Sequence, residues 1–162
     1  MSENIKKPWL KATIKEIKDL INNQTFLIED QNEGEPVNPC MDVYKAKIQS
    51  GESLDKLKLR MLVRGDLQNK ELVGDTGLPT ASMRTLKYFP ADETKHKARV
   101  HQLDSIGAFL KAKVNNRVFV KLDISYTDYF PEYAQYFGRA LRLLKSMYGT
   151  TNSVKLFADE LA

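Results

Sequence analysis

The spacing of apolar residues near the start of the chain predicts a helix. One face of that helix would carry the apolar residues Trp9, Ala12, Ile17, Leu20 and Ile21. Pro8 suits the first turn of such a helix, and Asn22-Asn23 suit its end. A short strand over residues 25–29 and a loop over residues 30–40, rich in Asn, Glu, Gly and Pro, are predicted to come next.

The segment LKLRMLVR, residues 57–64, alternates between apolar and mostly cationic positions, as a half-buried strand does. Its apolar face would carry Leu57, Leu59, Met61 and Val63. Its other face would carry Lys58, Arg60, Leu62 and Arg64. Two interpretations of the cationic face stay open: an ordinary solvated surface, or a rigid surface whose countercharges meet phosphate groups.

The rest of the chain mixes short strands and helices. Three further segments are strand candidates, residues 43–49, 98–104 and 118–122. Helix candidates occur near residues 86–88, ahead of Pro90, and over residues 153–162, while residues 107–110 suit a tight turn or helix start. The aromatic residues between 124 and 138 are more typical of a packed cluster than of a base-stacking platform. Without regular βαβ alternation, this order predicts an α+β fold.

Composition narrows the class only a little. The 162 residues, 42% hydrophobic and 28% charged, suit one globular domain, and a net charge of +4 is compatible with nucleic acid but not diagnostic of it. Cys40 is the sole cysteine, which favours a reducing compartment, and a zinc site with His96 and His101 lacks ligand spacing. With a polar N-terminus and no long apolar stretch, we expect an intracellular protein, cytoplasmic or nuclear, that is neither secreted nor bound to a membrane.

Five blocks of sequence, in the same order, resemble the reverse transcriptase domain of copia-type retrotransposons. Together they cover nearly the whole chain, so the set is far more specific than any single block. The blocks are the run from Trp9 to Phe26 with Ala12, Glu16, Leu20, Asn23 and Thr25, then KLRMLVRGDLQ (58–68), DTGLPTASMRTLK (75–87), HQLDSIGAFL (101–110) and the weaker RLLKSMYGTTNS (142–153).

The resemblance implies one truncated domain over residues 1–162, with fingers up to about residue 98 and the start of a right-hand polymerase palm over 99–162. It implies an RNA-directed DNA polymerase, which adds deoxynucleotides to a DNA primer on an RNA template with two Mg²⁺ ions. One metal activates the primer hydroxyl and the other neutralises the leaving pyrophosphate. Mg²⁺ takes oxygen ligands, so carboxylates are required.

Asp104 matches the first metal-binding aspartate of the family and would be its catalytic residue, with the main-chain carbonyl of Ser105 as a further metal ligand. Taken alone, an Asp between a strand and a turn is usually a cap, and Ser105 could also cap a helix that starts after it. The flanking Ala108-Phe109 favours the metal. Phe109 matches the bulky ring that excludes a ribonucleotide 2′-hydroxyl, although a core aromatic explains it equally well.

Lys58 and Arg60 match fingers cations that hold the nucleotide triphosphate, and their shared strand face supports this independently. Gly149, after Tyr148, would sit near the nascent base pair, where a missing side chain permits close approach. These residues complete the substrate-binding set that the resemblance implies.

The sequence also departs from the family. The second half of the metal site is an Asp-Asp pair in a later hairpin; this chain has no Asp-Asp and stops before that hairpin, so we expect it to be inactive alone. Asp42 and Asp66 occupy expected apolar positions, costing about 1–3 kcal/mol each if buried without a partner. Two alternatives therefore remain: a non-catalytic nucleic-acid-binding module, or a scaffold that self-associates or packs against the remainder of the polyprotein.

Overall fold

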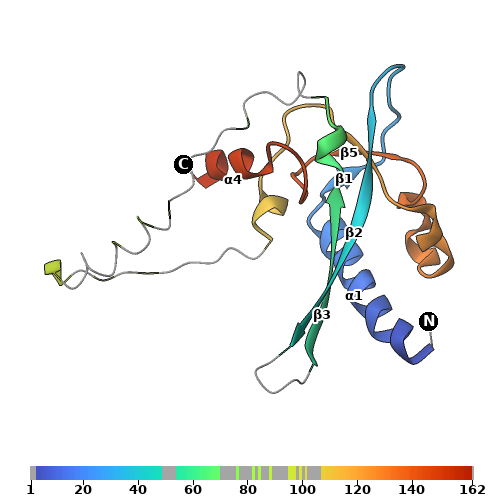
Figure 1. Ribbon diagram of the computed structural model, residues 1–162. Helices are drawn as coiled ribbons and strands as arrows, with labels where there is room; N and C mark the ends of the chain where they lie inside the picture. Colours follow the sequence, from blue (N-terminus) through green and yellow to red (C-terminus); the bar gives the residue numbers. More distant parts are fainter. Residues whose placement is uncertain are drawn as a thin grey trace.

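A five-stranded mixed sheet organises the part of the chain that the structure describes (Figure 1). The structure is a computed structural model and describes residues 3–48, 54–69, 76, 82, 84, 88, 95–97, 99, 101 and 107–161. The strand order is β1-β5-β4-β2-β3, with β2 and β4 parallel and the other neighbours antiparallel. The strands are β1 (Phe26–Leu27), β2 (Val37–Ile48), β3 (Leu54–Val63), β4 (Phe119–Lys121) and β5 (Ala140–Leu143). With its helices, this sheet confirms the α+β class.

The predicted N-terminal helix is α1 (Glu3–Asn22), which ends where Asn22-Asn23 indicated. It packs against β3, and Ile17 and Leu20 on its apolar face are buried. The first-turn assignment of Pro8 is wrong, because the helix begins at Glu3 and places Pro8 inside it. A proline there removes one main-chain hydrogen bond, and the buried apolar face offsets that loss.

Strands β2 and β3 form a long antiparallel ribbon (Figure 1). The predicted alternation is confirmed: Leu59, Met61 and Val63 are buried. The predicted loop over residues 30–40 is wrong at its end, since β2 begins at Val37. This first part of β2 pairs with β4, and the Asn38 side chain donates a hydrogen bond of 3.0 Å to the Phe119 carbonyl. A partner strand distant in sequence thus overrides the turn-forming composition.

One hydrophobic core joins α1 and β3 to β4, β5 and the segments that follow those two strands. β4 confirms the strand predicted over residues 118–122, and Phe119, Val120 and Leu141 are fully buried. The aromatic segment is a packed cluster, as predicted, with buried rings at Tyr126, Phe130 and Phe137. The C-terminal helix is also confirmed, as α4 (Ser153–Leu161).

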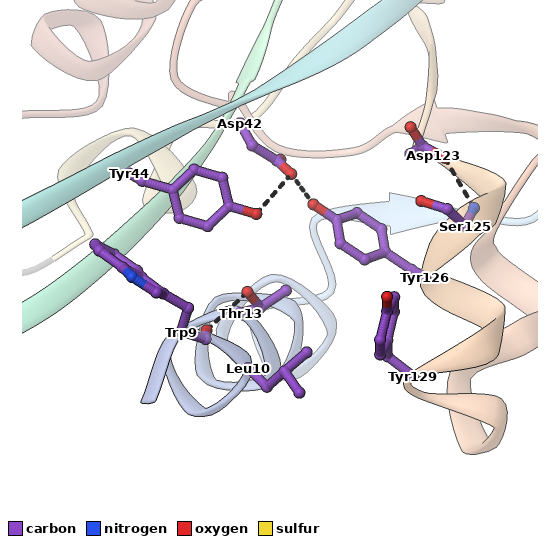
Figure 2. A pocket seen from close by; sticks show the side chains of 9 residues that line it. All are labelled: Trp9, Leu10, Thr13, Asp42, Tyr44, Asp123, Ser125, Tyr126 and Tyr129. Atoms are coloured by element: carbon purple, nitrogen blue, oxygen red, sulfur yellow. Dashed lines mark hydrogen bonds between the residues drawn. The ribbon is translucent and has the colours of Figure 1, made fainter. Parts of the chain in front are cut away.

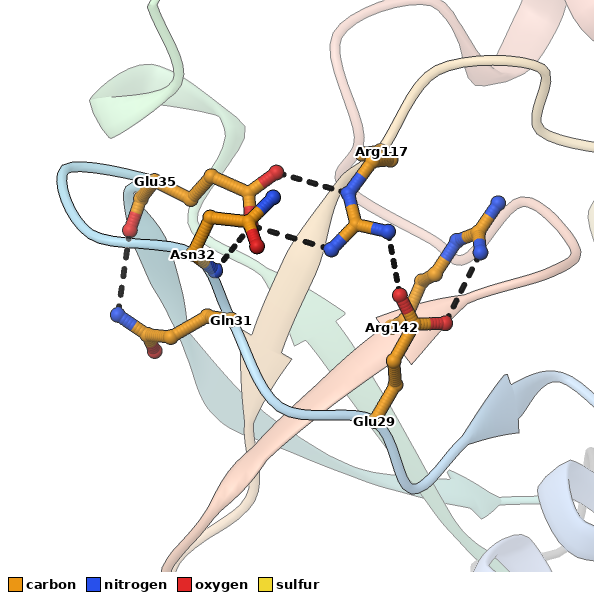
Figure 3. Close-up of polar contacts among 6 residues, drawn as sticks. All are labelled: Glu29, Gln31, Asn32, Glu35, Arg117 and Arg142. Carbon is orange, nitrogen blue, oxygen red and sulfur yellow. Dashed lines mark hydrogen bonds and ion pairs between the residues drawn. The ribbon is translucent and has the colours of Figure 1, made fainter.

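A partly exposed ionic network links the segment after β1 to the sheet (Figure 3). Arg117 pairs with Glu29 and donates from Nε to Glu35 Oε1 at 2.8 Å. Arg142 on β5 donates to the other oxygen of Glu29 at 2.9 Å. These arginines hold the pKa values of Glu29 and Glu35 below their ordinary range by hydrogen bonding to the charged form. The network fixes the approach of the chain to β2.

Several predictions concern residues that the structure does not describe. Most of residues 75–87, the helix candidate before Pro90 and the strand ending at Asp104 lie outside the described residues. The turn predicted over residues 107–110 is confirmed, with Gly107 in the left-handed region ahead of a 3-10 helix, η2 (Ala108–Lys111). Among the described helices, none has the length and apolar character that crossing a membrane requires.

Candidate nucleic-acid interface

The β2–β3 ribbon separates two kinds of side chain by its register. Residues directly opposite each other in an antiparallel pair lie on the same face. Tyr44 opposite Leu59 and Asp42 opposite Met61 therefore belong to the face that meets the core. The opposite face carries five cations, which we call the basic face: Lys45, Lys47, Lys56, Lys58 and Arg60.

The basic face places like charges directly across from each other. Lys45 pairs with Lys58, and Lys47 pairs with Lys56. Like charges at such positions destabilise a sheet by roughly 0.2–1 kcal/mol per pair. The eight positions from four consecutive pairs of this face hold the five cations, three apolar residues (Met41, Val43 and Leu62) and no carboxylate. No carboxylate at these eight positions neutralises the charge of the basic face.

A pocket of about 440 Å³, which we call the basic pocket, lies where the edge strand β3 meets α1. Lys56, Lys58 and Arg60 line it from β3, and Lys15, Glu16 and Asp19 line it from α1. Burial raises the pKa of Glu16. A hydrogen bond from the Met61 backbone and the positive charges of Arg60 and Lys58 oppose that shift. Burial lowers the pKa of Lys58, as do Arg60 and the neighbouring lysines, while Glu16 opposes this. The pocket therefore combines partly desolvated cations with one partly desolvated carboxylate.

Tyr148 lines this pocket together with Arg60, and other aromatic rings pack behind it. The Arg60 guanidinium lies over the Tyr148 ring, 4.2 Å from its centroid, which fixes the charge by a cation–π contact. Phe109 packs edge-on against Tyr148, with ring centroids 5.2 Å apart, and also contacts Phe157. Phe109 is half-buried. The structure thus brings together Lys58, Arg60 and Phe109, three residues that the sequence singled out separately.

Gly149 makes a close backbone contact with β3. Its φ is +87°, and a Cβ there would lie 2.2 Å from the Val63 carbonyl oxygen. The Tyr148 carbonyl accepts a hydrogen bond of 2.8 Å from Val63 N. Gly65 is equally tight, since a Cβ on it would lie 2.0 Å from the Gly149 carbonyl oxygen. The close approach allowed by Gly149 is therefore to the chain itself, and the second and fifth sequence blocks meet at these two glycines.

Arg64 and Asp66 differ from what the sequence suggested. Arg64 makes a two-pronged contact with the Asp66 carboxylate, at 2.8 and 2.7 Å, so its charge is matched locally. Asp66 is exposed, and the cost expected for a buried carboxylate does not arise. Of the three cations expected on the strand, Lys58 and Arg60 alone line the basic pocket.

The predicted metal ligands, Asp104 and the Ser105 carbonyl, lie outside the described residues. Within the described part of the chain, no group of three or more His, Cys, Asp or Glu side chains could hold a metal ion. Cys40 is half-buried, and burial raises the pKa of its thiol to about 12. That thiol stays protonated at neutral pH and is a poor metal ligand.

Comparison with known proteins identifies no relative of this chain. No family model, no curated protein and no solved structure matches this chain.

Sequence reasoning missed three members of the basic face, Lys45, Lys47 and Lys56. The pattern Lys-Ala-Lys at residues 45–47 places two cations on one side of a strand. That pattern could have identified two of them. Only the pairing register shows that these lysines share a face with Lys58 and Arg60.

Proposed function

We propose that this chain is the fingers and partial palm of a copia-type reverse transcriptase, and that it binds an RNA template and DNA primer through the basic face. One observation carries the binding proposal: two directly opposed lysine pairs on a face without a carboxylate. Such a face costs stability in the free protein. An anionic partner relieves that repulsion, which makes a polyanion the natural ligand.

The shape of the ribbon suits a phosphate backbone. Successive side chains on one face of a strand lie about 6.6–6.8 Å apart, and neighbouring strands about 4.8 Å apart. The basic face therefore presents its charges as a rigid array, in which Lys45, Lys47 and Lys56 are exposed. Lysine and arginine that neutralise phosphates release condensed counterions, so affinity should fall steeply with salt.

The contacts that Arg60 makes beside the basic pocket support the proposed polymerase origin. Arg60, Tyr148 and Phe109, from three separate sequence blocks, contact one another in series. In the proposed enzyme, Lys58 and Arg60 face the triphosphate, Phe109 limits the space beside the sugar and Gly149 holds the chain close to β3. Asp104 and the Ser105 carbonyl would hold Mg²⁺, which supplies charge neutralisation during nucleotidyl transfer. The carboxyl group of Asp104 is the right donor type for that ion.

The proposal does not include primer extension by these 162 residues alone. They contain no adjacent Asp pair, and one carboxylate is a poor ligand set for two metals. We therefore propose that this chain binds primed template without extending it, and that extension needs a second polypeptide segment carrying the missing carboxylates.

A paired binding and primer-extension assay tests this function. The chain is mixed with an RNA template annealed to a DNA primer, with Mg²⁺ and deoxynucleotides, beside an Asp104→Asn variant. We expect salt-dependent binding by both proteins and extension by neither. Extension that Asp104→Asn abolishes would refute the inactivity of the chain while supporting its polymerase origin. Absence of binding at low salt would refute the proposed function.

A further inference from the structure

A second cavity, of about 560 Å³, lies between α1, β2 and the segment after β4 (Figure 2). Its walls include four aromatic side chains and two carboxylates. We call it the aromatic pocket and define it by those six residues, Trp9, Tyr44, Tyr126, Tyr129, Asp42 and Asp123. Its volume lies within the range of about 300–1,000 Å³ that is typical of small-molecule sites.

The aromatic rings come from three elements and face a shared space (Figure 2). Trp9 on α1 meets Tyr44 on β2 edge-to-face, with centroids 5.2 Å apart and planes at 88°. Tyr126 and Tyr129 line the side of the pocket opposite α1 and β2. Tyr126 lies in the 3-10 helix η3 (Ile124–Asp128), and Tyr129 is the residue directly after it. Tyr129 is 52% exposed and Tyr44 is 51% exposed. Large aromatic surfaces that stay this accessible around a cavity leave ring faces available to a ligand.

The polar groups of the pocket are acidic. The Asp42 carboxylate accepts hydrogen bonds from the phenols of Tyr126 and, at 3.5 Å, Tyr44. Asp123 accepts a hydrogen bond of 2.8 Å from Ser125 N, which lowers its pKa and keeps it ionised. None of the described residues that line the pocket is Lys, Arg or His. In a chain with 25 Lys and Arg residues, the negative charge of this pocket is thus left without a cationic side chain in its lining.

We infer that the aromatic pocket binds a small organic cation with an alkylated ammonium group. Ring faces attract such cations through their negative π-surfaces, and nearby carboxylates add direct charge complementarity. A hydrated metal ion fits less well, since Mg²⁺ and Ca²⁺ require about six or more oxygen ligands and gain little from rings. Burial and the neighbouring Asp123 raise the pKa of Asp42, which an organic cation would reverse. This site is independent of the proposed binding of nucleic acid.

Choline and its uncharged isostere, 3,3-dimethylbutan-1-ol, test the inference directly. The two probes have nearly the same shape, so their difference isolates the charge. Titrating each into the full chain, with tryptophan fluorescence and proton NMR shifts as readouts, should give saturable binding of choline, with the isostere at least about tenfold weaker. Equal affinity for the two probes, or no saturation by choline, would overturn the inference.

Substitutions then locate the site. Asp42→Asn removes the central charge, and Asp123→Asn removes the second charge while keeping an acceptor for Ser125 N. The matched control is Asp128→Asn, an exposed carboxylate on η3 that does not line the pocket. We expect choline binding to weaken about tenfold in Asp42→Asn and several-fold in Asp123→Asn, and to stay unchanged in the control. Equal losses in all three variants would indicate only net charge and contradict a defined site.

Discussion

The basic pocket and the aromatic pocket both use α1 and the β2–β3 ribbon, yet cations predominate in the first, whereas the charged residues that line the second are both carboxylates. Lys15, Glu16 and Asp19 of the helix line the first, while Trp9 and Thr13 line the second. On β2, Asp42 and Tyr44 point to one face and Lys45 to the other. The period of two along a strand is what permits this separation. The ribbon can therefore present cations to one ligand and the Asp42 carboxylate to another with no intervening element.

The largest effect should come from the backbone contact that supports the basic pocket. Gly149→Ala would force an unfavourable φ and bring a Cβ against the Val63 carbonyl. We expect a loss of about 2–4 kcal/mol in the free energy of unfolding, measured by urea denaturation. Gly34→Ala is the matched control, because Gly34 has a φ of +83° but no atom within 4 Å of the added Cβ. Its loss should be nearer 1 kcal/mol, and equal losses would refute the contact.

The aromatic pocket should respond to pH through Asp42. Burial raises its folded-state pKa above the ordinary 3.8, so this group lowers stability as pH rises from 3.8 through the raised value. Asp42→Asn should therefore be modestly more stable than wild type at pH 7, with the difference vanishing below about pH 3.8. Chemical denaturation of both proteins across this range measures it. A less stable variant at pH 7, or a difference independent of pH, would show that the tyrosine hydrogen bonds to the carboxylate outweigh the cost of its burial.

The basic face should show the smallest stability change. Lys45→Glu replaces a like-charge pair across from Lys58 with an opposite-charge pair, and should stabilise the chain by about 0.2–1 kcal/mol. The comparison protein is Lys18→Glu, which makes the same charge change on an exposed helix position that lines neither pocket. Thermal unfolding at low and high salt measures both, and the gain should shrink with salt. If Lys18→Glu stabilised the chain equally, relief of net charge would explain the effect.

Local sequence patterns predicted the strands and helices better than they predicted the residues that line the pockets. The alternation of residues 57–64 fixed both faces of β3, because strand geometry depends on nothing outside the segment. The start of β2 at Val37 was missed because its partner, β4, lies some eighty residues away in sequence. Asp42 seemed a misfit at an apolar position. Its tyrosine partners come from β2 itself and from Tyr126, so only the folded chain reveals that its carboxylate has donors.

Only part of the candidate interface could be predicted from the sequence. Lys58 and Arg60 were identified from one strand, whereas Lys45, Lys47 and Lys56 joined them through the pairing register. Arg64 was expected among the cations that meet phosphate, but its neighbour Asp66 matches its charge. Pairwise contacts of this kind depend on side-chain placement, which sequence periodicity does not specify.

The salt dependence of binding to an RNA–DNA hybrid is the most direct test of the basic face. For wild type, Kd plotted against salt on logarithmic axes should give a steep slope, of about 0.7–0.9 for each phosphate contacted. Lys58→Gln should reduce that slope by about one contact, and Lys18→Gln should leave it unchanged. Equal slopes for wild type and Lys58→Gln, with binding intact, would mean that nucleic acid lies elsewhere on the chain and would contradict the account.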